Sequence, residues 1–569
     1  MTAQIVADVR GLTISYQAGD QRVTVVRDLS FSLAEGRTLG LVGESGSGKS
    51  TAARTLLGHL RDGSRIDAGS VEVFGDDVFA LAPEPLRRLR GGTVALVAQN
   101  AGHALTPTLR VGEQIREALR VHGLPSGDDR LTELFRLVRL PNPASIGRRY
   151  PHELSGGQQQ RVGIAMAVAT NPKVLVLDEP TTALDVITQA AVLSLVNDLR
   201  AELGMAVLIV SHDLGVISAV ADDVLVLNAG SEVERGAVLD VLERPAETYT
   251  RELIDAAPRL AAPAPDVRDR ADDAILSCSG IDIRYPGAPR LAVRGFGLEI
   301  RRGETVAIVG ESGSGKSTVA TAFAGLAPTT AGTAALTDSE GRAHDLLRPV
   351  ARRPVDVRRS VQLVFQNADL ALNPRRTVGD AIARPLKVFS RVSGAAARRR
   401  RVAELLTEVG LGPEFASRIP AQLSGGQRQR VGIARALAAD PTLLIADEIT
   451  TALDVSVQAD VLDLLAGLRD ERSLSCLFIS HDLAVVRDVA DRIVVMNDGL
   501  VVEQAPAARL FASPRHPYTR SLLDAVVEPG STDLPGSDAD ARAVRIDPGA
   551  PLVDIGGGHL VRNDEGAAL

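Results

Sequence analysis

The stretch GESGSGKST occurs twice in the chain, at residues 43–51 and again at residues 310–318. Each copy fits the pattern G-x-x-x-x-G-K-[ST], in which backbone N–H groups face phosphate oxygens, the lysine reaches the terminal phosphates and the serine hydroxyl binds Mg²⁺. We therefore expect two phosphate-binding loops, each between a strand and the N-terminus of a helix. Their residues are Gly43, Ser45, Gly46, Gly48, Lys49, Ser50 and Thr51, and Gly310, Ser312, Gly313, Gly315, Lys316, Ser317 and Thr318.

An acidic pair follows each loop, at the end of an apolar run that predicts a buried strand. The pairs are Asp178–Glu179 after VLVL and Asp447–Glu448 after LLIA. Acids at a strand end are usually only solvated. Downstream of a phosphate loop, however, the aspartate can hold Mg²⁺ and the glutamate can take a proton from the water that attacks the γ-phosphate. We therefore expect Glu179 and Glu448 to act as general bases.

Two further strings recur in both halves of the chain. His212 and His481 follow apolar runs within SHDL. A lone histidine there would more often be structural, but its recurrence in register favours a catalytic contact. The string LSGGQ, at 154–158 and 423–427, predicts a helix start with a serine N-cap and two glycines that permit close approach to the backbone. The expected binding residues are Ser155, Gly156, Gly157 and Gln158, and Ser424, Gly425, Gly426 and Gln427.

The chain is a duplication, because every landmark of the first half returns in the same order in the second. Stretches rich in Pro, Ala and charged residues read as a linker and as the start of a tail that we expect to be partly mobile. The predicted organisation is a first domain at residues 1–258, a linker at 259–274, a second domain at 275–527 and a C-terminal tail at 528–569.

The alternation of short apolar strands with helical stretches predicts the fold class. In each half it indicates an α/β domain with a mainly parallel sheet that is covered on both faces. From 109 to 150 and from 376 to 420 the pattern becomes helical, so a helical insert is expected before each LSGGQ string.

Composition limits the function classes. The 569 residues are 45% hydrophobic and 24% charged, as in ordinary folded proteins, and the net charge of −8 offers no broad positive field for nucleic acid. We find no signal-peptide pattern and no uncharged apolar run of about 18 residues, so no membrane span is expected. The two cysteines lack metal-ligand spacing and fit a reducing cytosol.

In these motifs the chain resembles the ATP-binding-cassette (ABC) ATPases over nearly its whole length. The resemblance implies two tandem P-loop NTPase domains, each with an N-terminal antiparallel β region, which bind ATP and Mg²⁺ and hydrolyse ATP. It adds the glutamine loops, the aspartates of the ALD loops and aromatic rings that stack on adenine, at Gln99 and Gln366, Asp185 and Asp454, and Tyr16 and Tyr285. The implied Mg²⁺ ligands are Ser50, Gln99 and Asp178, and Ser317, Gln366 and Asp447.

The resemblance also accounts for the duplication, since ABC ATPases pair two cassettes head to tail. Each ATP would lie between the phosphate loop of one half and the LSGGQ string of the other. By this arrangement the loop at 43–51 faces Ser424 and its neighbours, and the loop at 310–318 faces Ser155 and its neighbours. Both sites keep every catalytic residue type, so we expect both to hydrolyse ATP.

Two further segments narrow the resemblance to the oligopeptide, dipeptide and nickel importer ATPases. The stretch QNADLALNPRRTVGDAI follows the second glutamine loop, and RPAETYTRELIDAAP (244–258) and SPRHPYTRSLLDAVV (513–527) resemble the HPYT segment of that group. The implied protein is the ATPase subunit of a peptide-type importer at the cytoplasmic face of the cell membrane. Its implied partners are two transmembrane permease subunits and an extracytoplasmic solute-binding protein, and no nucleic acid is expected. We expect no iron–sulfur cluster, because no cysteine follows Cys476 and Asn563 stands where one would be expected.

The transported solute stays open among peptides, glutathione-like compounds and nickel or other metal chelates, because solute contacts lie in other chains. An alternative is a soluble tandem-cassette ATPase that acts on ribosomes or DNA. Such proteins join their cassettes by a long charged helix, whereas the linker here is short and rich in proline. The run ARRRR at 397–401 is the best support for that alternative, but we interpret it as the solvated start of an insert helix. A dinucleotide-dependent enzyme is disfavoured because the glycine spacing lacks G-x-G-x-x-G.

Overall fold

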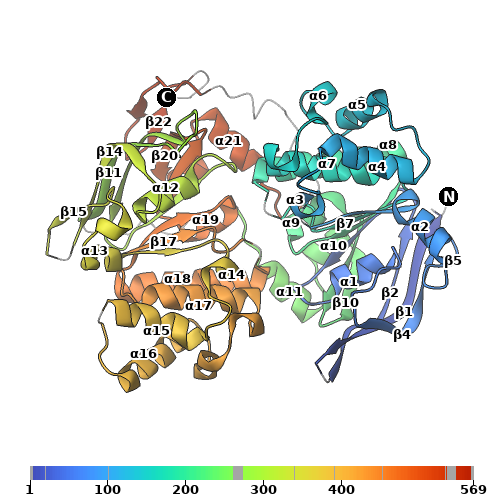
Figure 1. The fold of residues 1–569 in the computed structure, drawn as a ribbon, viewed down its shortest axis with the longest axis horizontal. Helices are drawn as coiled ribbons and strands as arrows, with labels where there is room; N and C mark the ends of the chain where they lie inside the picture. The colour runs from blue at the N-terminus through green and yellow to red at the C-terminus, as the bar shows by residue number, and fades with distance from the viewer. Residues whose placement is uncertain are drawn as a thin grey trace.

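Each half of the chain builds one antiparallel and one mainly parallel sheet, and the two halves form two lobes (Figure 1). The structure is a computed structural model. It describes residues 4–19, 21–99, 101–182, 184–260, 273–338, 340–389, 391–451, 453–531, 534 and 546–564. The predicted α/β class, with a parallel core, an antiparallel β region and a helical insert in each half, is confirmed.

The main sheet of the first half has the strand order β10-β9-β3-β8-β7-β6 and is parallel except at β10. Its strands are β3 (Thr38–Val42), β6 (Val94–Val97), β7 (Val174–Asp178), β8 (Ala206–Val210), β9 (Asp223–Asn228) and β10 (Ser231–Ala237). The antiparallel sheet has the order β2-β1-β4-β5, built from β1 (Ile5–Ala18), β2 (Gln21–Ala34), β4 (Ser64–Val73) and β5 (Asp76–Asp77).

The second half repeats this plan. Its antiparallel sheet, order β12-β11-β14-β15, contains β11 (Ala274–Ile283), β12 (Val293–Arg301), β14 (Thr329–Thr337) and β15 (Ala343–Asp345). Its main sheet has the order β16-β17-β18-β13-β19-β20-β22-β21. These strands are β13 (Thr305–Val309), β16 (Val361–Val364), β17 (Leu443–Asp447), β18 (Ser475–Ile479), β19 (Arg492–Asn497), β20 (Leu500–Pro506), β21 (Leu552–Asp554) and β22 (Leu560–Arg562).

Helices cover the face of each main sheet that is turned away from the antiparallel sheet. In the first half they are α1 (Lys49–Thr55), α2 (Pro83–Gly92), α3 (Ala101–Ala104), α4 (Val111–Val121), α5 (Asp128–Leu137), α6 (Pro143–Ile146), α7 (Gly156–Val168), α8 (Val186–Leu203), α9 (Leu214–Val220), α10 (Val238–Glu243) and α11 (Thr248–Asp255). In the second half they are α12 (Lys316–Phe323), α13 (Val355–Ser360), α14 (Ala368–Ala371), α15 (Val378–Val388), α16 (Ala395–Glu408), α17 (Gly425–Leu437), α18 (Val455–Arg472), α19 (Leu483–Val489), α20 (Ala507–Ala512) and α21 (Pro517–Asp524). The exceptions are α1 and α2 in the first half and α12 and α13 in the second, which pack on the opposite face.

The layers follow from the two-residue period of the strands. In β7, Leu175 and Leu177 belong to the core under α7 and α8, whereas Val174 and Val176 belong to the core under the antiparallel sheet. All five residues of β7 are buried, which is why the strand reads as a continuous apolar run. Burial on both faces fixes the end of the strand, and with it the position of Asp178.

The C-terminal tail contributes to the fold of both halves. Strands β21 and β22 form a hairpin that extends the second main sheet beyond β20. Upstream of them, the segment 526–531 packs on α9 of the first half, where Ser218 donates a hydrogen bond to the carbonyl of Ser531 and accepts one from the N–H of Gly530 (2.6 and 3.0 Å). The tail therefore connects the two halves.

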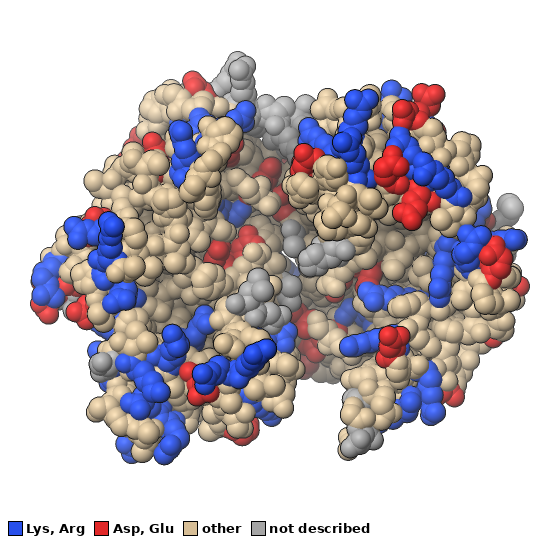
Figure 2. All heavy atoms as spheres, viewed as in Figure 1, with Lys and Arg blue, Asp and Glu red and all other residues tan. Residues whose placement is uncertain are grey.

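Arginines gather over α15 and α16 at the lower left of Figure 2, whereas basic and acidic side chains alternate over α4 and α5 at the upper right. The ARRRR run lies in the first turns of α16, with Arg399 and Arg400 exposed, so its interpretation as the start of an insert helix is confirmed. Within the part of the chain that the structure describes, no helix has the length and apolar character needed to cross a bilayer.

Candidate functional site

The phosphate loops follow β3 and β13 and lead into α1 and α12, as predicted. In the first loop the ammonium of Lys49 donates to the carbonyls of Gly43 and Glu44 (2.6 and 2.8 Å). Lys316 makes the same two bonds in the second loop (2.7 and 2.8 Å). Burial lowers the pKa of both lysines although carboxylates around them act in the opposite direction. In each loop the buried lysine ammonium is thus hydrogen-bonded to the backbone of its own loop.

The first glycine of each loop is required by close backbone packing. Gly43 has a φ of 141°, and a Cβ atom there would lie 2.0 Å from the carbonyl oxygen of Leu227. Gly310 has a φ of 147°, and a Cβ atom would lie 2.1 Å from the carbonyl oxygen of Met496. No L side chain fits these positions, because the loop turns directly against the neighbouring strand.

In each half, the serine of the phosphate loop contacts the aspartate of the acidic pair at the edge of the main sheet. Ser50 donates to Asp178 (2.6 Å), and Ser317 donates to Asp447 (2.9 Å). A hydroxyl and a carboxylate at this separation are the oxygen donors that Mg²⁺ prefers, so the residues fit the expected metal. In the first half alone, Arg54 also forms an ion pair with Asp178 at 2.9 Å.

The proposed general base of the first half lies between two partners. Gln99 donates to one carboxylate oxygen of Glu179 (2.7 Å), and Nδ1 of His212 lies 3.5 Å from the other. Burial opposes the charge of both side chains, but the contact between them outweighs it. The pKa of Glu179 is therefore lowered and the pKa of His212 raised. Each shift favours the charged form, the carboxylate of Glu179 and the imidazolium of His212.

The second half has a similar cluster, in which Gln366 donates to Glu448 (2.6 Å) and Nδ1 of His481 lies 3.6 Å from the same carboxylate oxygen. The pKa shifts of Glu448 and His481 have the same directions and causes as in the first half. Both glutamates have a left-handed backbone, with φ values of 49° and 48°, which is strained for a residue with a side chain. This strain marks the turn that follows β7 and β17, where the sequence places the base.

Each LSGGQ string starts a helix, as predicted. Ser155 is the N-cap of α7 and accepts from the N–H of Gln158, while Ser424 and Gln427 form the same capping box in α17. The second glycine of each string is needed for packing, since a Cβ atom on Gly157 would lie 2.4 Å from Thr188. By contrast, no atom lies within 4 Å of a Cβ built on Gly425. Its backbone is open to a ligand.

The ALD loops reach across to the phosphate loop of the other half. The N–H of Ser45 donates to Asp454 (2.6 Å), and the N–H of Ser312 donates to Asp185 (3.4 Å). In Figure 1, α7 and α12 lie in the upper part of the two lobes and α1 and α17 in the lower part. The two halves are therefore arranged head to tail.

The ALD loop and the LSGGQ string of the first half differ in whether they reach the pocket of the second site. The pocket beside Lys316, of about 250 Å³, is lined by Gln366, Glu448, His481 and, from the first half, Asp185. Among its described lining residues there is none of residues 155–158. At this second site the structure thus places the ALD loop of the first half against the pocket, but not the LSGGQ string.

The two tyrosines expected at the adenine have different described contacts. The hydroxyl of Tyr285 is 3.2 Å from that of Thr318 in the second phosphate loop. Tyr16 lies within β1, opposite Val23 and Ser64. Only Tyr285 therefore has a described bond to its loop.

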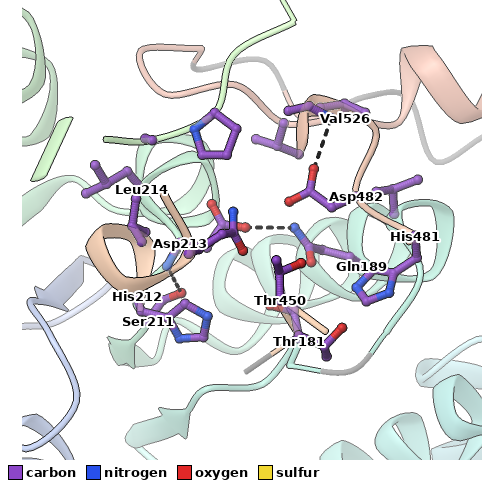
Figure 3. A pocket seen from close by; sticks show the side chains of 18 of the residues that line it. Thr181, Gln189, Ser211, His212, Asp213, Leu214, Thr450, His481, Asp482 and Val526 are labelled. Carbon is purple, nitrogen blue, oxygen red and sulfur yellow. Dashed lines mark hydrogen bonds between the residues drawn. The ribbon is translucent and has the colours of Figure 1, made fainter. Parts of the chain in front are cut away.

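A central cavity of about 160 Å³ lies between the halves, where the SHDL strings meet (Figure 3). His212 and Asp213 line it from the first half and His481 and Asp482 from the second. Asp213 and Asp482 cap α9 and α19, so the cavity joins the histidines of both sites to the helices that follow them.

Three contacts at the site were not predicted from the sequence. Besides the pair of Arg54 with Asp178, the hydroxyl of Ser456 donates to Glu44 across the interface (2.5 Å). The third is a tyrosine hydroxyl on each phosphate loop, from the HPYT segments at 244–258 and 513–527. The recurrence of these segments in both halves was the available signal, but it did not indicate what they touch.

Comparison with known proteins gives two matches to family models. The family described as ABC transporter matches residues 26–182 and 293–451. The family described as oligopeptide/dipeptide transporter, C-terminal region, matches residues 233–276 and 502–547.

Curated relatives match the chain from end to end. A glutathione import ATP-binding protein of Escherichia coli O157:H7 is 39% identical over 605 residues, which cover 97% of this chain and 96% of that protein. The protein of the same name from Salmonella choleraesuis (strain SC-B67) is 39% identical over 98% of this chain and 96% of its own length. Among solved structures, the archaeal ribosome recycling factor aABCE1 has a TM-score of 0.57 at 23% identity and covers 85% of this chain and 88% of its own. That likeness shows the fold alone.

Proposed function

Because this chain belongs to the ABC transporter ATP-binding proteins with an oligopeptide/dipeptide C-terminal region, we propose that it drives solute import by hydrolysing ATP at two composite sites. The protein is an ATPase subunit of an ABC importer.

The main support for the composite sites is that each ALD loop accepts a hydrogen bond from the phosphate loop of the opposite half. Asp454 accepts from the first phosphate loop and Asp185 from the second, so each loop has a partner residue from the opposite half. Closure of the halves by ATP would bring Ser424 and Ser155 to the γ-phosphates. The serines cap the N–H groups of Gln427 and Gln158, and the positive N-terminal ends of α17 and α7 suit an anion.

In the proposed reaction, Glu179 and Glu448 accept the proton of the attacking water. His212 and His481 lie beside them, where contact with the glutamate favours the imidazolium, and in that form they can stabilise the charge on the γ-phosphate. Gln99 and Gln366 orient the glutamates through their amide N–H groups. We expect ATP hydrolysis in both sites because each cluster has its own glutamine, glutamate and histidine.

Bound Mg²⁺ would neutralise charge on the transferred phosphate. Ser50 with Asp178 would hold it in the first site and Ser317 with Asp447 in the second, and Gln99 and Gln366 would supply further oxygen ligands. Lys49 and Lys316 would leave their carbonyl partners for the terminal phosphates.

We expect the partners of this subunit to be two transmembrane permeases and a solute-binding protein, with the ATPase peripheral at the cytoplasmic face of the membrane. The solute is proposed to be a short peptide or a peptide-like compound such as glutathione. The support is the glutathione import named for the curated relatives and the C-terminal region named for oligopeptide and dipeptide transport.

The experiment that tests the catalytic assignment is the double variant Glu179→Gln, Glu448→Gln. Glutamine keeps the hydrogen bond from the glutamine loop but cannot accept a proton. Steady-state ATP hydrolysis should fall by about a thousandfold, while equilibrium binding of a fluorescent ATP analogue persists.

A matched control is Glu202→Gln, Glu471→Gln, which makes the same change in register at exposed positions near the ends of α8 and α18. This control should hydrolyse ATP at the native rate. Retained turnover in the Glu179, Glu448 variant would refute the assigned base role.

A further inference from the structure

The HPYT segments place one tyrosine hydroxyl on each phosphate loop, at the same residue of the loop. The N–H of Glu311 donates to the hydroxyl of Tyr518 (2.9 Å), and the N–H of Glu44 donates to the hydroxyl of Tyr249 (3.3 Å). We propose that Tyr518 and Tyr249 are positioning residues for ATP binding, which fix the phosphate loop from the C-terminal region of each half. This inference rests on the proposed function.

The tyrosine holds the peptide unit that also carries the phosphate-binding lysine. In the second half the carbonyl of Gly310 accepts from Lys316 (2.7 Å), and the N–H of the same peptide unit belongs to Glu311 and donates to Tyr518. Both polar atoms of one peptide are therefore bonded to side chains. Because a peptide is planar, fixing its N–H also fixes the direction of its carbonyl. Without the hydroxyl this unit could rotate and change the backbone of the phosphate loop.

The tyrosine of the second half is held more firmly than that of the first. Tyr518 is fully buried, and burial raises its pKa well above the usual value, so its hydroxyl keeps its proton. Tyr249 is only half-buried and its bond is longer. A hydrogen bond to a buried hydroxyl costs more to lose than one to a half-exposed hydroxyl, since water replaces the lost partner less easily. The effect of the hydroxyl should therefore be larger at the second site.

Helix α21 is anchored by a buried polar cluster that includes the tail. Nδ1 of His516 accepts from the N–H of Tyr518 (3.2 Å), and Glu503 accepts from the N–H of His516 (3.0 Å). His559, from the tail hairpin, lies 2.7 Å from Glu503. A chain of contacts thus runs from the tail hairpin through β20 and α21 to the phosphate loop.

The first half has the same plan with fewer anchors. Glu234 takes the place of Glu503 and accepts from the N–H groups of Ala246 and Glu247 (2.8 and 3.3 Å). Glu247 stands where His516 stands in the second half, and among the described residues no second hairpin extends β10. This difference agrees with the looser bond of Tyr249.

The test is Tyr518→Phe in a chain that also carries Lys49→Ala, so that a fluorescent ATP analogue reports the second site. Loss of one hydrogen bond to the loop should raise the Kd of the analogue about fivefold. In the otherwise native chain, Tyr518→Phe should raise the KM for ATP and leave kcat nearly unchanged, because Glu448 and His481 are untouched. A merely structural role would not separate KM from kcat.

The matched control is Thr519→Val, on the same helix and equally buried, whose hydroxyl has no hydrogen-bond partner among the described residues. It should leave the Kd unchanged. A second variant, Tyr249→Phe with Lys316→Ala, lies at a half-exposed position where loss of the hydroxyl does not threaten folding, and it should raise the Kd by a smaller factor.

An unchanged Kd in both tyrosine variants, or an equal rise in Thr519→Val, would overturn the inference. If the Lys49→Ala chain with native Tyr518 fails to bind the analogue at all, the proposed composite sites are at fault instead. The two failures are therefore distinguishable.

Discussion

Arg54 is the clearest difference between the two sites. Its guanidinium forms an ion pair with Asp178, whereas the corresponding residue of α12 is Thr321, whose hydroxyl bonds to its own helix. An aspartate that bonds an arginine is a weaker ligand for a cation, because the two positive groups compete for the same oxygens. The first site should therefore need more Mg²⁺ than the second.

This difference can be measured by Arg54→Thr in a chain that carries Lys316→Ala. The Mg²⁺ concentration for half-maximal binding of a fluorescent ATP analogue should fall several-fold, since about one charge-assisted bond to Asp178 is removed. The reciprocal change, Thr321→Arg in a Lys49→Ala chain, should raise it at the second site. Identical Mg²⁺ dependence in all four chains would contradict the competition.

The reacting residues could be predicted because they lie in short strings that recur letter for letter. The loop at 43–51 fixes its chemistry within nine residues, and Asp178 follows from the end of a fully buried strand. The bonds of Arg54 and Tyr249 were not predictable in this way. Each bond joins segments that are more than a hundred residues apart. Local sequence periodicity does not indicate which side chains of such distant segments are in contact.

Among the elements, α9 and α19 illustrate how duplicated segments diverge. Gly215 and Ser218 of α9 contact the segment 526–531. The equivalent positions of α19 are occupied by Ala484 and Arg487. A Cβ atom on Gly215 would lie 2.1 Å from the carbonyl oxygen of Val527. The glycine is therefore required by this contact and not by the helix.

Gly215→Ala should displace the segment from α9 and lower the Tm by several degrees, because the clash also removes the bonds to Ser218. The matched control is Gly467→Ala, in an exposed part of α18 where nothing lies within 4 Å of a built Cβ. There alanine should stabilise the helix by about 1 kcal/mol and raise the Tm. Equal shifts of Tm in the two variants would show that the segment does not depend on Gly215.

The strands and helical inserts were predictable from apolar periodicity, whereas the tail hairpin was not. β21 and β22 have three residues each, and the stretch between them contains three glycines. Such short strands carry too little pattern to be recognised. Their order comes from pairing with β20 and from the buried contact of His559 with Glu503. The domain boundaries at 258, 274 and 527 stay predictions.

For the whole molecule, the contacts between the halves join the two sites. Ser456 donates to Glu44 beside the first loop, whereas Ile187 occupies the equivalent position beside the second and packs into the core of the other half. The central cavity lies between the two histidines. Movement of one half relative to the other would therefore change both sites together. The head-to-tail order itself was available only through the family resemblance, because it depends on contacts between distant segments.

We propose above all that each ATP is bound by residues of both halves. The most direct measurement is an experimental structure of the Glu179→Gln, Glu448→Gln variant with ATP and Mg²⁺. We expect one triphosphate between Lys49 and Ser424 and another between Lys316 and Ser155, each within hydrogen-bond distance of both partners. A triphosphate enclosed by the residues of a single half, with the opposite LSGGQ string out of reach, would contradict the account.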